Sequence, residues 1–294
     1  MNGGLNNSRV SVIIPTMASA QRGALLQRAI ESVRASSSKP VRIIVIVNGS
    51  CSDTAVCIWL QAQEDIHLEY VANPSAPGAI LRGRELVETE FFSTLDDDDE
   101  YLPGTTDLKM LSLEADAQAD VLIANTYRCS DGMDVESYAG LNNVPANPLE
   151  CLMQFNWLTS GNAMYRTNSV GISYFIGYHA HAEWTWLAFR LAIDGKCISI
   201  INQPTCRHHN TAGSLSKSDV YFQSCIPLYK RMLDSSPPHL VMRMIQRKMG
   251  ATYHEASVTA LENGRRKEAW RNHWKSLIKT GGLRYLTYTR HLFK

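Results

Sequence analysis

Five consecutive acidic residues occupy positions 96–100, directly after an apolar run. Adjacent carboxylates repel one another, so a compact fold tolerates them best where a cation or a helix N-terminus offsets their charge. A divalent ion bound to a diphosphate would do this, because Mg²⁺ and Mn²⁺ favour one or two carboxylates plus phosphate oxygens. The run therefore predicts either a Mn²⁺ or Mg²⁺ site or, as the alternative, a solvated acidic loop.

A second group of possible ligands consists of His179, His181 and Glu183, which are spaced two residues apart. On an extended strand their side chains would face one way, as zinc ligands can, and His208 and His209 could add to them. This arrangement would indicate a metallohydrolase. It leaves the acidic run unexplained, and measurement of bound zinc would distinguish the two hypotheses.

Strand and helix patterns alternate over the first half of the chain. Apolar runs typical of strands lie at 10–14, 42–47, 68–72, 91–95 and 120–124. Amphipathic helical patterns lie between them, at 24–33, 53–63 and 79–88. This alternation predicts an α/β fold with a doubly wound parallel sheet, in which ligands bind beyond the carboxyl ends of the strands. The acidic run follows one of those ends.

The second half of the chain has a different pattern. A polar, proline-containing stretch at 142–148 indicates a boundary, and it is followed by an aromatic-rich helix at 184–193 and a strand at 197–201. After about residue 214 the pattern is helical. Trp270, Trp274, Leu277 and Ile278 form an apolar stripe at helical spacing, which predicts a helix that packs through this stripe.

Composition limits the classes of function. Lys and Arg total 29 against 28 for Asp and Glu, so the overall charge gives no reason to expect nucleic-acid binding. Positions 265–294 hold nine Lys or Arg residues and one acid, Glu268, which indicates a possible contact with an anionic membrane surface. The sequence shows no signal peptide or spanning segment, so we expect a cytoplasmic protein, with peripheral attachment to the inner face of the membrane as a possibility. Seven scattered cysteines without a CxxC pair predict reduced thiols.

Four ordered motifs in the first hundred residues resemble a known family. Residues 95–103, LDDDDEYLP, resemble the Asp-x-Asp-Asp…Pro signature of the inverting family-two glycosyltransferases. Residues 12–16 resemble their opening strand, 47–53 resemble their uridine-contacting turn, and Asn73 with Gly78, Ala79 and Arg82 resembles their Asn-x-Gly…Ala-Arg segment. The resemblance implies an enzyme that uses a nucleotide-sugar donor. It also implies a Rossmann-like GT-A fold with a mixed central sheet, followed by a helical C-terminal region.

The resemblance assigns roles to individual residues of this half. It implies that Asp98 ligates the metal and that Asp96 contacts the ribose or base side of the donor, with Asp97 in the variable position. The donor-binding residues that it implies are Pro15, Thr16, Asn48, Asp53, Arg82, Asp96 and Asp97. A UDP-sugar is the expected donor. Val47 and Asn48 replace the family's two acids, however, so the nucleobase stays open.

The same resemblance continues more loosely into the second half. Residues 161–166 resemble the Gly-x-x-x-x-Arg strand that borders the acceptor site, and 182–187 resemble the Glu-Asp-Trp-x-x-Trp motif, whose second acid corresponds to Glu183. A carboxylate suits the removal of a proton from the acceptor hydroxyl, so Glu183 is implied as the general base. A helix-capping role is the alternative. Residues 207–210 with Ser214 and Ser216 resemble a loop over the donor, which implies a metal or diphosphate contact for His209.

These observations divide the chain into three expected regions. Residues 1–140 form the nucleotide-sugar-binding half, 141–216 form the acceptor-binding and catalytic half of the same domain, and 217–294 form the helical C-terminal region. The resemblance implies a saccharide or lipid-linked acceptor and a role in polysaccharide biosynthesis. A catalytically inactive protein that binds a sugar nucleotide is a further alternative. A dehydrogenase is disfavoured because no GxGxxG follows the first strand.

Overall fold

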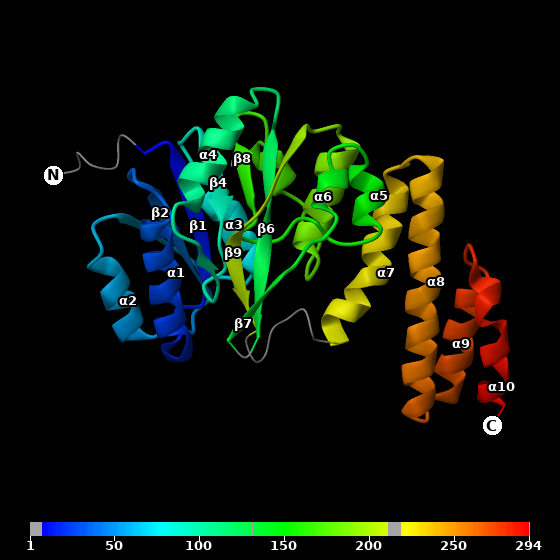
Figure 1. The fold of residues 1–294 in the computed structure, drawn as a ribbon. Helices are drawn as coiled ribbons and strands as arrows, with labels where there is room; N and C mark the ends of the chain where they lie inside the picture. The colour runs from blue at the N-terminus through cyan, green and yellow to red at the C-terminus, as the bar shows by residue number, and fades with distance from the viewer. Residues whose placement is uncertain (1–7, 131, 211–218, 294) are drawn as a thin grey trace. The chain divides into compact units, whose positions relative to one another are not determined.

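The structure is a computed structural model and describes residues 8–130, 132–210 and 219–293. The chain divides into two compact units (Figure 1). The first comprises residues 1–151, 156–178 and 183–214, and the second comprises 152–155, 179–182 and 215–294.

One sheet runs through the first unit, in the strand order β3-β2-β1-β4-β8-β6-β9-β5, with β7 paired to β6. The strands are β1 (Val10–Thr16), β2 (Arg42–Asn48), β3 (Ile66–Val71), β4 (Phe91–Thr94), β5 (Glu100–Tyr101), β6 (Val121–Ser130), β7 (Met133–Glu136), β8 (Ala163–Arg166) and β9 (Ile198–His209). Strands β1 to β4 are parallel, and β6 is parallel to β9. Strand β8 lies antiparallel between β4 and β6. The purely parallel sheet was therefore a wrong prediction, and the mixed sheet is confirmed.

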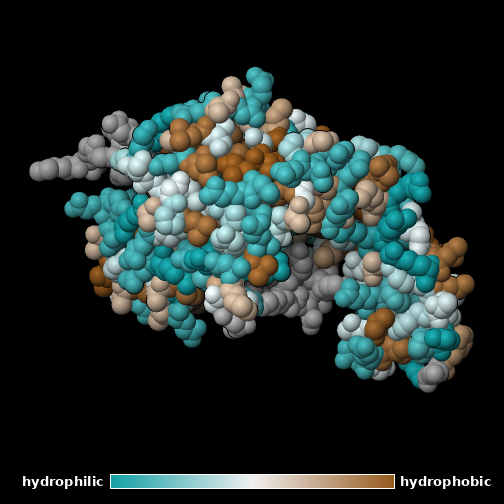
Figure 2. Space-filling view, in the orientation of Figure 1, coloured by the Kyte–Doolittle hydropathy of each residue, from teal (hydrophilic) through white to brown (hydrophobic). Residues whose placement is uncertain are grey.

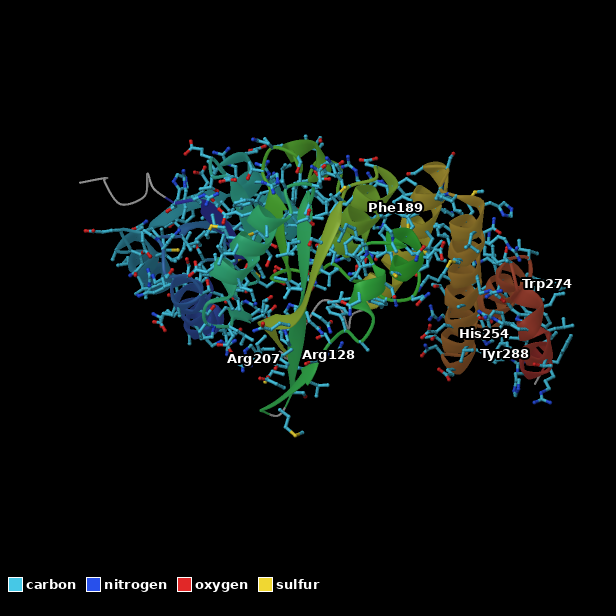
Figure 3. All side chains as sticks on the ribbon, turned by 45° about the horizontal axis from the view of Figure 1, so that its top comes forward. Arg128, Phe189, Arg207, His254, Trp274 and Tyr288 are labelled. Carbon is cyan, nitrogen blue, oxygen red and sulfur yellow. The ribbon has the colours of Figure 1, made fainter. Side chains whose placement is uncertain are left out.

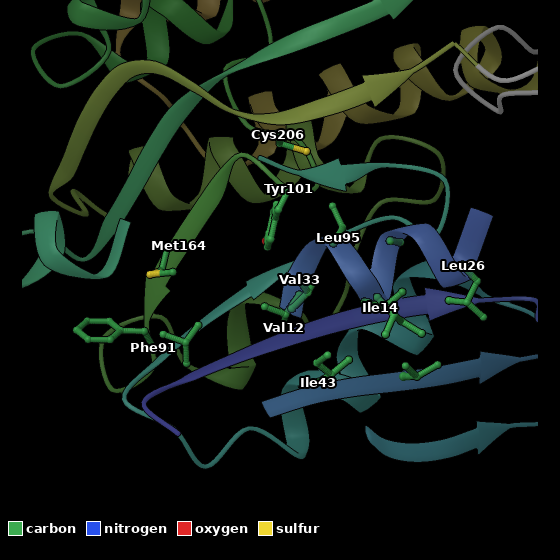
Figure 4. Close-up of a cluster of buried hydrophobic side chains, with 14 of the residues drawn as sticks. Val12, Ile14, Leu26, Val33, Ile43, Phe91, Leu95, Tyr101, Met164 and Cys206 are labelled. Atoms are coloured by element: carbon green, nitrogen blue, oxygen red, sulfur yellow. The ribbon is translucent and has the colours of Figure 1, made fainter. Parts of the chain in front are cut away.

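Helices of the first unit bury apolar side chains against the sheet, and Asp53 and Ser75 cap two of them. They are α1 (Gly23–Ala35), α2 (Thr54–Gln61), α3 (Ala76–Glu85), α4 (Thr105–Ala115), α5 (Pro148–Leu152) and α6 (Glu183–Ile193), with short 3-10 turns η2 (Ala20–Arg22), η3 (Leu141–Asn143) and η4 (Ile172–Tyr174). Helix α1 places Leu26 and Val33 against Val12, Ile14 and Ile43 of β1 and β2 (Figure 4). Burial of these side chains holds β1 and β2 in place, and the carboxyl ends of these strands carry predicted donor-binding residues.

The second unit is helical, as expected. It contains α7 (Asp219–Asp234), α8 (His239–Glu262), α9 (Arg266–Leu277), the 3-10 segment η6 (Gly282–Tyr288) and α10 (Thr289–Leu292). Between α8 and η6, the ring of His254 stacks on Tyr285 with centroids 4.1 Å apart and meets Tyr288 edge-on (Figure 3). None of the described helices is long and apolar enough to cross a bilayer.

The buried face of α9 is not the one that the apolar stripe predicted. Its buried residues are Ala269, Asn272, His273 and Ser276. The Ser257 hydroxyl of α8 donates to the backbone oxygen of Ala269 at 2.7 Å, so small and polar side chains let the two helices approach closely. Trp274 and Ile278 are exposed instead. Trp270 is partly buried and packs against Ala260, Ala269 and Leu292, so the prediction that this helix packs through its tryptophan stripe is confirmed for Trp270 and wrong for Trp274 and Ile278.

Candidate active site

The acidic run forms a tight turn at the carboxyl end of β4. The N–H of Leu95 donates to Ile13 of β1 at 2.9 Å, and the N–H of Asp99 donates to the carbonyl of Asp96 at 3.1 Å. This turn places one carboxylate oxygen each from Asp96, Asp98 and Asp99 within 4.8 Å of one another. Three hard oxygen ligands suit Mg²⁺ or Mn²⁺.

The turn is not a solvated loop. Only 7% of the surface of Asp99 is exposed, and Asp96 and Asp98 are half-buried. Burial raises the pKa of Asp96 to about 7; the hydrogen bond from Ser160 opposes this shift, and the charges of Asp98, Asp97 and Glu183 add to it. Burial also raises the pKa of Asp99 well above its ordinary value. A cation among these carboxylates would relieve their repulsion, so the site favours positive charge.

Asp97, predicted to contact the donor, points into the protein and is 5% exposed. The Thr16 hydroxyl donates to its Oδ2 at 2.5 Å, and Nε of Arg22 donates to its Oδ1 at 3.0 Å. Thr16 was also predicted to line the donor pocket. The two residues therefore hold the loop after β1 onto the acidic turn, and Arg22 supplies the charge that compensates for a buried carboxylate.

The remaining predicted donor residues lie near the carboxyl ends of neighbouring parallel strands. Pro15 pairs in register with Ile46 between β1 and β2. Asn48 ends β2, and its Oδ1 accepts a hydrogen bond from the N–H of Ser75 at 2.7 Å.

Two further predicted donor residues make local structural contacts. Asp53 caps α2 by accepting from the N–H of Val56 at 3.1 Å. Arg82 forms ion pairs with Glu69 and Glu85, each at 3.1 Å. In this arrangement Asp53 shapes the turn after β2, while Arg82 is engaged by surface acids.

His209 was expected in a loop, but it belongs to β9. Its backbone N–H donates to Asp99 Oδ1 at 2.9 Å, and its Nε2 lies 3.0 Å from Glu100 Oε1. The Arg207 guanidinium donates to the same Glu100 oxygen at 2.7 Å, and Arg207 lies near the tip of the sheet (Figure 3). Within the described residues, the group of possible metal ligands contains neither His208 nor His209. His209 thus supports the turn through its backbone, and its predicted contact with metal or diphosphate stays a prediction. Ser214 and Ser216 lie outside the described residues.

A second loop, residues 157–162, supports the acidic turn from the side of β8. Gly161 has φ +81°, and a Cβ there would lie 2.6 Å from Cys206 Sγ, so only glycine fits. The buried Lys109 donates to the carbonyl of Gly161 at 2.6 Å. Nε2 of His208 lies 2.9 Å from the carbonyl of Ser160, whose side chain hydrogen-bonds Asp96. The loop therefore positions a hydroxyl on one of the three clustered carboxylates.

Glu183 is the first residue of α6 and lines a small hollow. Aromatic side chains dominate the wall of this hollow, among them Tyr174, Tyr178, Trp184 and Trp186. The charge of Glu183 contributes to the raised pKa of Asp96, so the two carboxylates interact electrostatically. The structure therefore combines an acid with a surface on which a sugar ring or another flat group can lie.

The arrangement expected for a zinc hydrolase is absent. Residues 179–182 form a turn, in which His181 has φ +66°, and Glu183 begins a helix. The predicted extended strand was therefore wrong, and its period-two geometry does not hold. His179 Nε2 lies 3.0 Å from the carbonyl of Ser224 instead.

Comparison with known proteins identifies the family. The family model described as Glycosyl transferase family 2 matches residues 11–180, more than half of the chain. The chain belongs to glycosyl transferase family 2. This confirms the resemblance found in the motifs, and the family makes the protein a glycosyltransferase.

A curated relative agrees with this assignment over part of its length. The GalNAc(5)-diNAcBac-PP-undecaprenol beta-1,3-glucosyltransferase of Campylobacter jejuni is 33% identical over 100 residues. That match covers 33% of this chain and 31% of the relative, so the chain spans about a third of the relative's length.

Solved structures show the same fold. The S. aureus TarS 1–349 structure in complex with UDP-GlcNAc has a TM-score of 0.56 at 12% identity, and the match covers 90% of this chain and 89% of that chain. Another structure of S. aureus TarS has a TM-score of 0.57 at 12% identity and covers 82% of this chain and 43% of that chain. The GT-A fold expected from the motifs is confirmed.

Sequence reasoning missed several residues of this site. Asp99 lies in the acidic run, but nothing in the run itself separates it from Asp97. The supporting roles of Arg22, Lys109 and Ser160 depend on contacts with residues far away in the chain. Their identities carried no local signal that could have indicated these roles.

Proposed function

We propose that this glycosyltransferase moves a sugar from a UDP-sugar to an acceptor hydroxyl with inversion, assisted by Mn²⁺ or Mg²⁺. The observation that carries the proposal is the group of Asp96, Asp98 and Asp99 at the carboxyl end of β4. Ligands of parallel α/β sheets bind at this edge. The three carboxylates would hold the ion, with Asp98 as the principal ligand. When bound, the ion would offset the charge of the donor diphosphate and of the leaving nucleotide.

The residues of the chain have separate tasks in this proposal. Asn48, Asp53 and Asp96 border the donor, while Arg22 and Thr16 hold Asp97 and so fix the acidic turn. Glu183 takes the proton from the acceptor hydroxyl as its oxygen attacks the anomeric carbon. The sugar-nucleotide bond breaks on the opposite face of that carbon, which inverts its configuration. A positioned carboxylate suits this role.

We propose a saccharide or lipid-linked acceptor. The hollow beside Glu183 supports a saccharide, because aromatic side chains form its wall. The Campylobacter jejuni relative is named for an acceptor on undecaprenyl diphosphate, and this supports the lipid-linked form. A role in polysaccharide biosynthesis at the inner face of the membrane, with peripheral contact through the basic C-terminal region, belongs to the same proposal.

A donor screen tests the proposal. Thermal shift and donor hydrolysis would be measured with UDP-, GDP- and dTDP-sugars, each with Mn²⁺, with Mg²⁺ and with a chelator. We expect a UDP-sugar to stabilise the protein and to be hydrolysed slowly only when a divalent ion is present. Equal responses with chelator would contradict the metal assignment, and a response to GDP- or dTDP-sugars alone would contradict the choice of nucleotide.

A further inference from the structure

The solvent face of α9 combines basic and large apolar side chains. Lys267, Arg271, Trp274, Lys275 and Ile278 recur at intervals of four, three, one and three residues, which places them on one side of a helix. All five are exposed. The exposed fractions of Trp274 and Ile278 are 60% and 76%. The acid that borders this face is Glu268.

Packing within the unit does not explain these apolar side chains. The opposite side of α9 supplies the buried residues, as described above. Trp274 stacks on Trp270 with centroids 6.4 Å apart, and Trp270 meets Phe293 edge-on at 5.0 Å. Phe293 is 76% exposed. Trp270 is partly buried against Ala260, Ala269 and Leu292, so Trp274 and Phe293 form the solvent-exposed part of this aromatic cluster.

The residues around this cluster also combine exposed apolar side chains with positive charge. Leu283 and Leu286 of η6 are exposed. Positions 265–294 carry nine Lys or Arg residues and only Glu268 as an acid, which pairs with Arg265 at 3.0 Å. Hydrophobic and hydrophilic residues are interleaved on the surface of this unit (Figure 2). The composition is that of an interfacial helix, with aromatic and aliphatic residues beside bases.

We propose that the solvent face of α9, together with Phe293, Leu283 and Leu286, docks on an anionic lipid surface. Trp274 and Ile278 would enter the boundary between headgroups and acyl chains, while Lys267 and Arg271 extend to lipid phosphates; Lys275 lies over the Tyr253 ring at 5.4 Å. This assignment rests on the peripheral membrane contact proposed above and names the residues that make it; it does not depend on the transfer reaction.

Two other occupants fit the chemistry less well. A nucleic acid would satisfy the bases, but its phosphate backbone would leave Ile278 and Leu283 exposed to water. A second copy of the chain would cover the apolar residues, but it would bring two surfaces rich in like charge together. Only an anionic bilayer interface offers apolar depth and negative charge side by side.

Co-sedimentation of the full chain with vesicles tests the proposal. Phosphatidylcholine vesicles, with or without phosphatidylglycerol, would be compared at low salt. We expect binding to the anionic vesicles only and release when salt is raised, because salt screens the charge contribution. Equal binding to both vesicle types, or binding to neither, would overturn the proposal.

Matched variants separate the apolar and charged contributions. Trp274→Ser with Ile278→Ser should weaken vesicle binding, whereas Ile58→Ser, which changes a 60% exposed side chain of α2, should not. Lys267→Glu with Arg271→Glu should reduce affinity on the order of tenfold or more, since each near-surface charge contributes ~1 kcal/mol. The control for this charge reversal is Lys39→Glu, which changes a base in an exposed loop.

Folding and oligomeric state complete the test. Circular dichroism would confirm that each variant folds. If the variant with Trp274→Ser and Ile278→Ser does not fold, the variant with Lys267→Glu and Arg271→Glu still tests the proposal. If a double variant of α9 and its control variant lose vesicle binding to the same extent, the assignment of the docking surface to α9 is overturned. The proposal would also be overturned if the native chain is a dimer that does not bind vesicles and the Trp274→Ser and Ile278→Ser variant is a monomer. Donor hydrolysis should stay unchanged in all variants, so failure here leaves the proposed transfer reaction intact.

Discussion

Arg22 contacts two adjacent acids that have different roles. Its Nε donates to Asp97 Oδ1 at 3.0 Å, while its Nη2 lies 3.2 Å from Oδ2 of Asp98. One guanidinium thus compensates for a structural carboxylate and also reaches a carboxylate that we assign to the metal. The ion pairs raise the pKa of Arg22, chiefly through the hydrogen bond to Asp97, so its charge is permanent. The fold of the acidic turn and its electrostatics are therefore coupled through one side chain.

Arg22→Met should destabilise the fold, because it leaves Asp97 buried with only the Thr16 hydroxyl as a described partner. Removal of one member of a buried pair typically costs 3–5 kcal/mol, and the partial exposure of Arg22 reduces our expectation to about 2 kcal/mol. Urea denaturation measures this change. The double variant Arg22→Met with Asp97→Asn should recover part of the loss. If the double variant loses the sum of the two single effects, the pair does not act as described.

Asp98→Asn should abolish the metal dependence of donor binding while the fold remains intact. Loss of residues that only support a metal ligand already costs about 10–100-fold in metal affinity, so loss of a direct ligand should cost at least that. Titration of the UDP-sugar with and without Mn²⁺ measures the effect. Asp116→Asn, at an exposed acid that ends α4, is the matched control. Unchanged metal dependence in Asp98→Asn would remove the central assignment.

The strands that position the site were predictable, because they are buried on both faces. Residues 10–14 and 42–47 are mostly apolar and β-branched, and β1 and β2 occupy Val10–Thr16 and Arg42–Asn48. Such runs give no strand direction, so the antiparallel β8 was not predictable from its apolar pattern. The length of β9 was also missed. Polar residues at its end, including His209, resemble a loop although they pair with β6.

Side-chain partners far away in the chain were not predictable. The run of acids indicated a cation site, but whether Asp97 or Asp99 joins it depends on Arg22, which reaches the turn from η2. The error at α9 has a different cause. Apolar periodicity reports that one helix face is hydrophobic, and it does not say whether protein or another apolar phase covers that face.

The buried Lys109 should make stability depend on pH. Burial lowers the pKa of Lys109 from 10.5 to about 8, so the native state releases this proton at a lower pH than the unfolded chain does. Between these two values the unfolded state binds more protons, and the contribution of Lys109 to stability therefore rises with pH. Lys109→Met should cost about 3 kcal/mol more at the alkaline end of this window than near neutrality. Urea denaturation of both proteins across the window measures the difference, and a cost independent of pH would contradict the assignment.

Glu183→Gln should separate binding from turnover. The substitution keeps the shape of the side chain but removes the group that accepts the proton, so the transfer rate should fall ~10²-fold or more. Affinities for donor and metal should change little, because we assign both to the acidic turn after β4. Rapid measurement of product from the UDP-sugar and a saccharide acceptor gives the rate, and calorimetry gives the affinities. Asp194→Asn is the matched control: this acid lies just beyond the end of α6 and interacts with Tyr174. If Glu183→Gln keeps near-full activity while Asp194→Asn loses it, the base is Asp194, and the assignment of Glu183 is wrong.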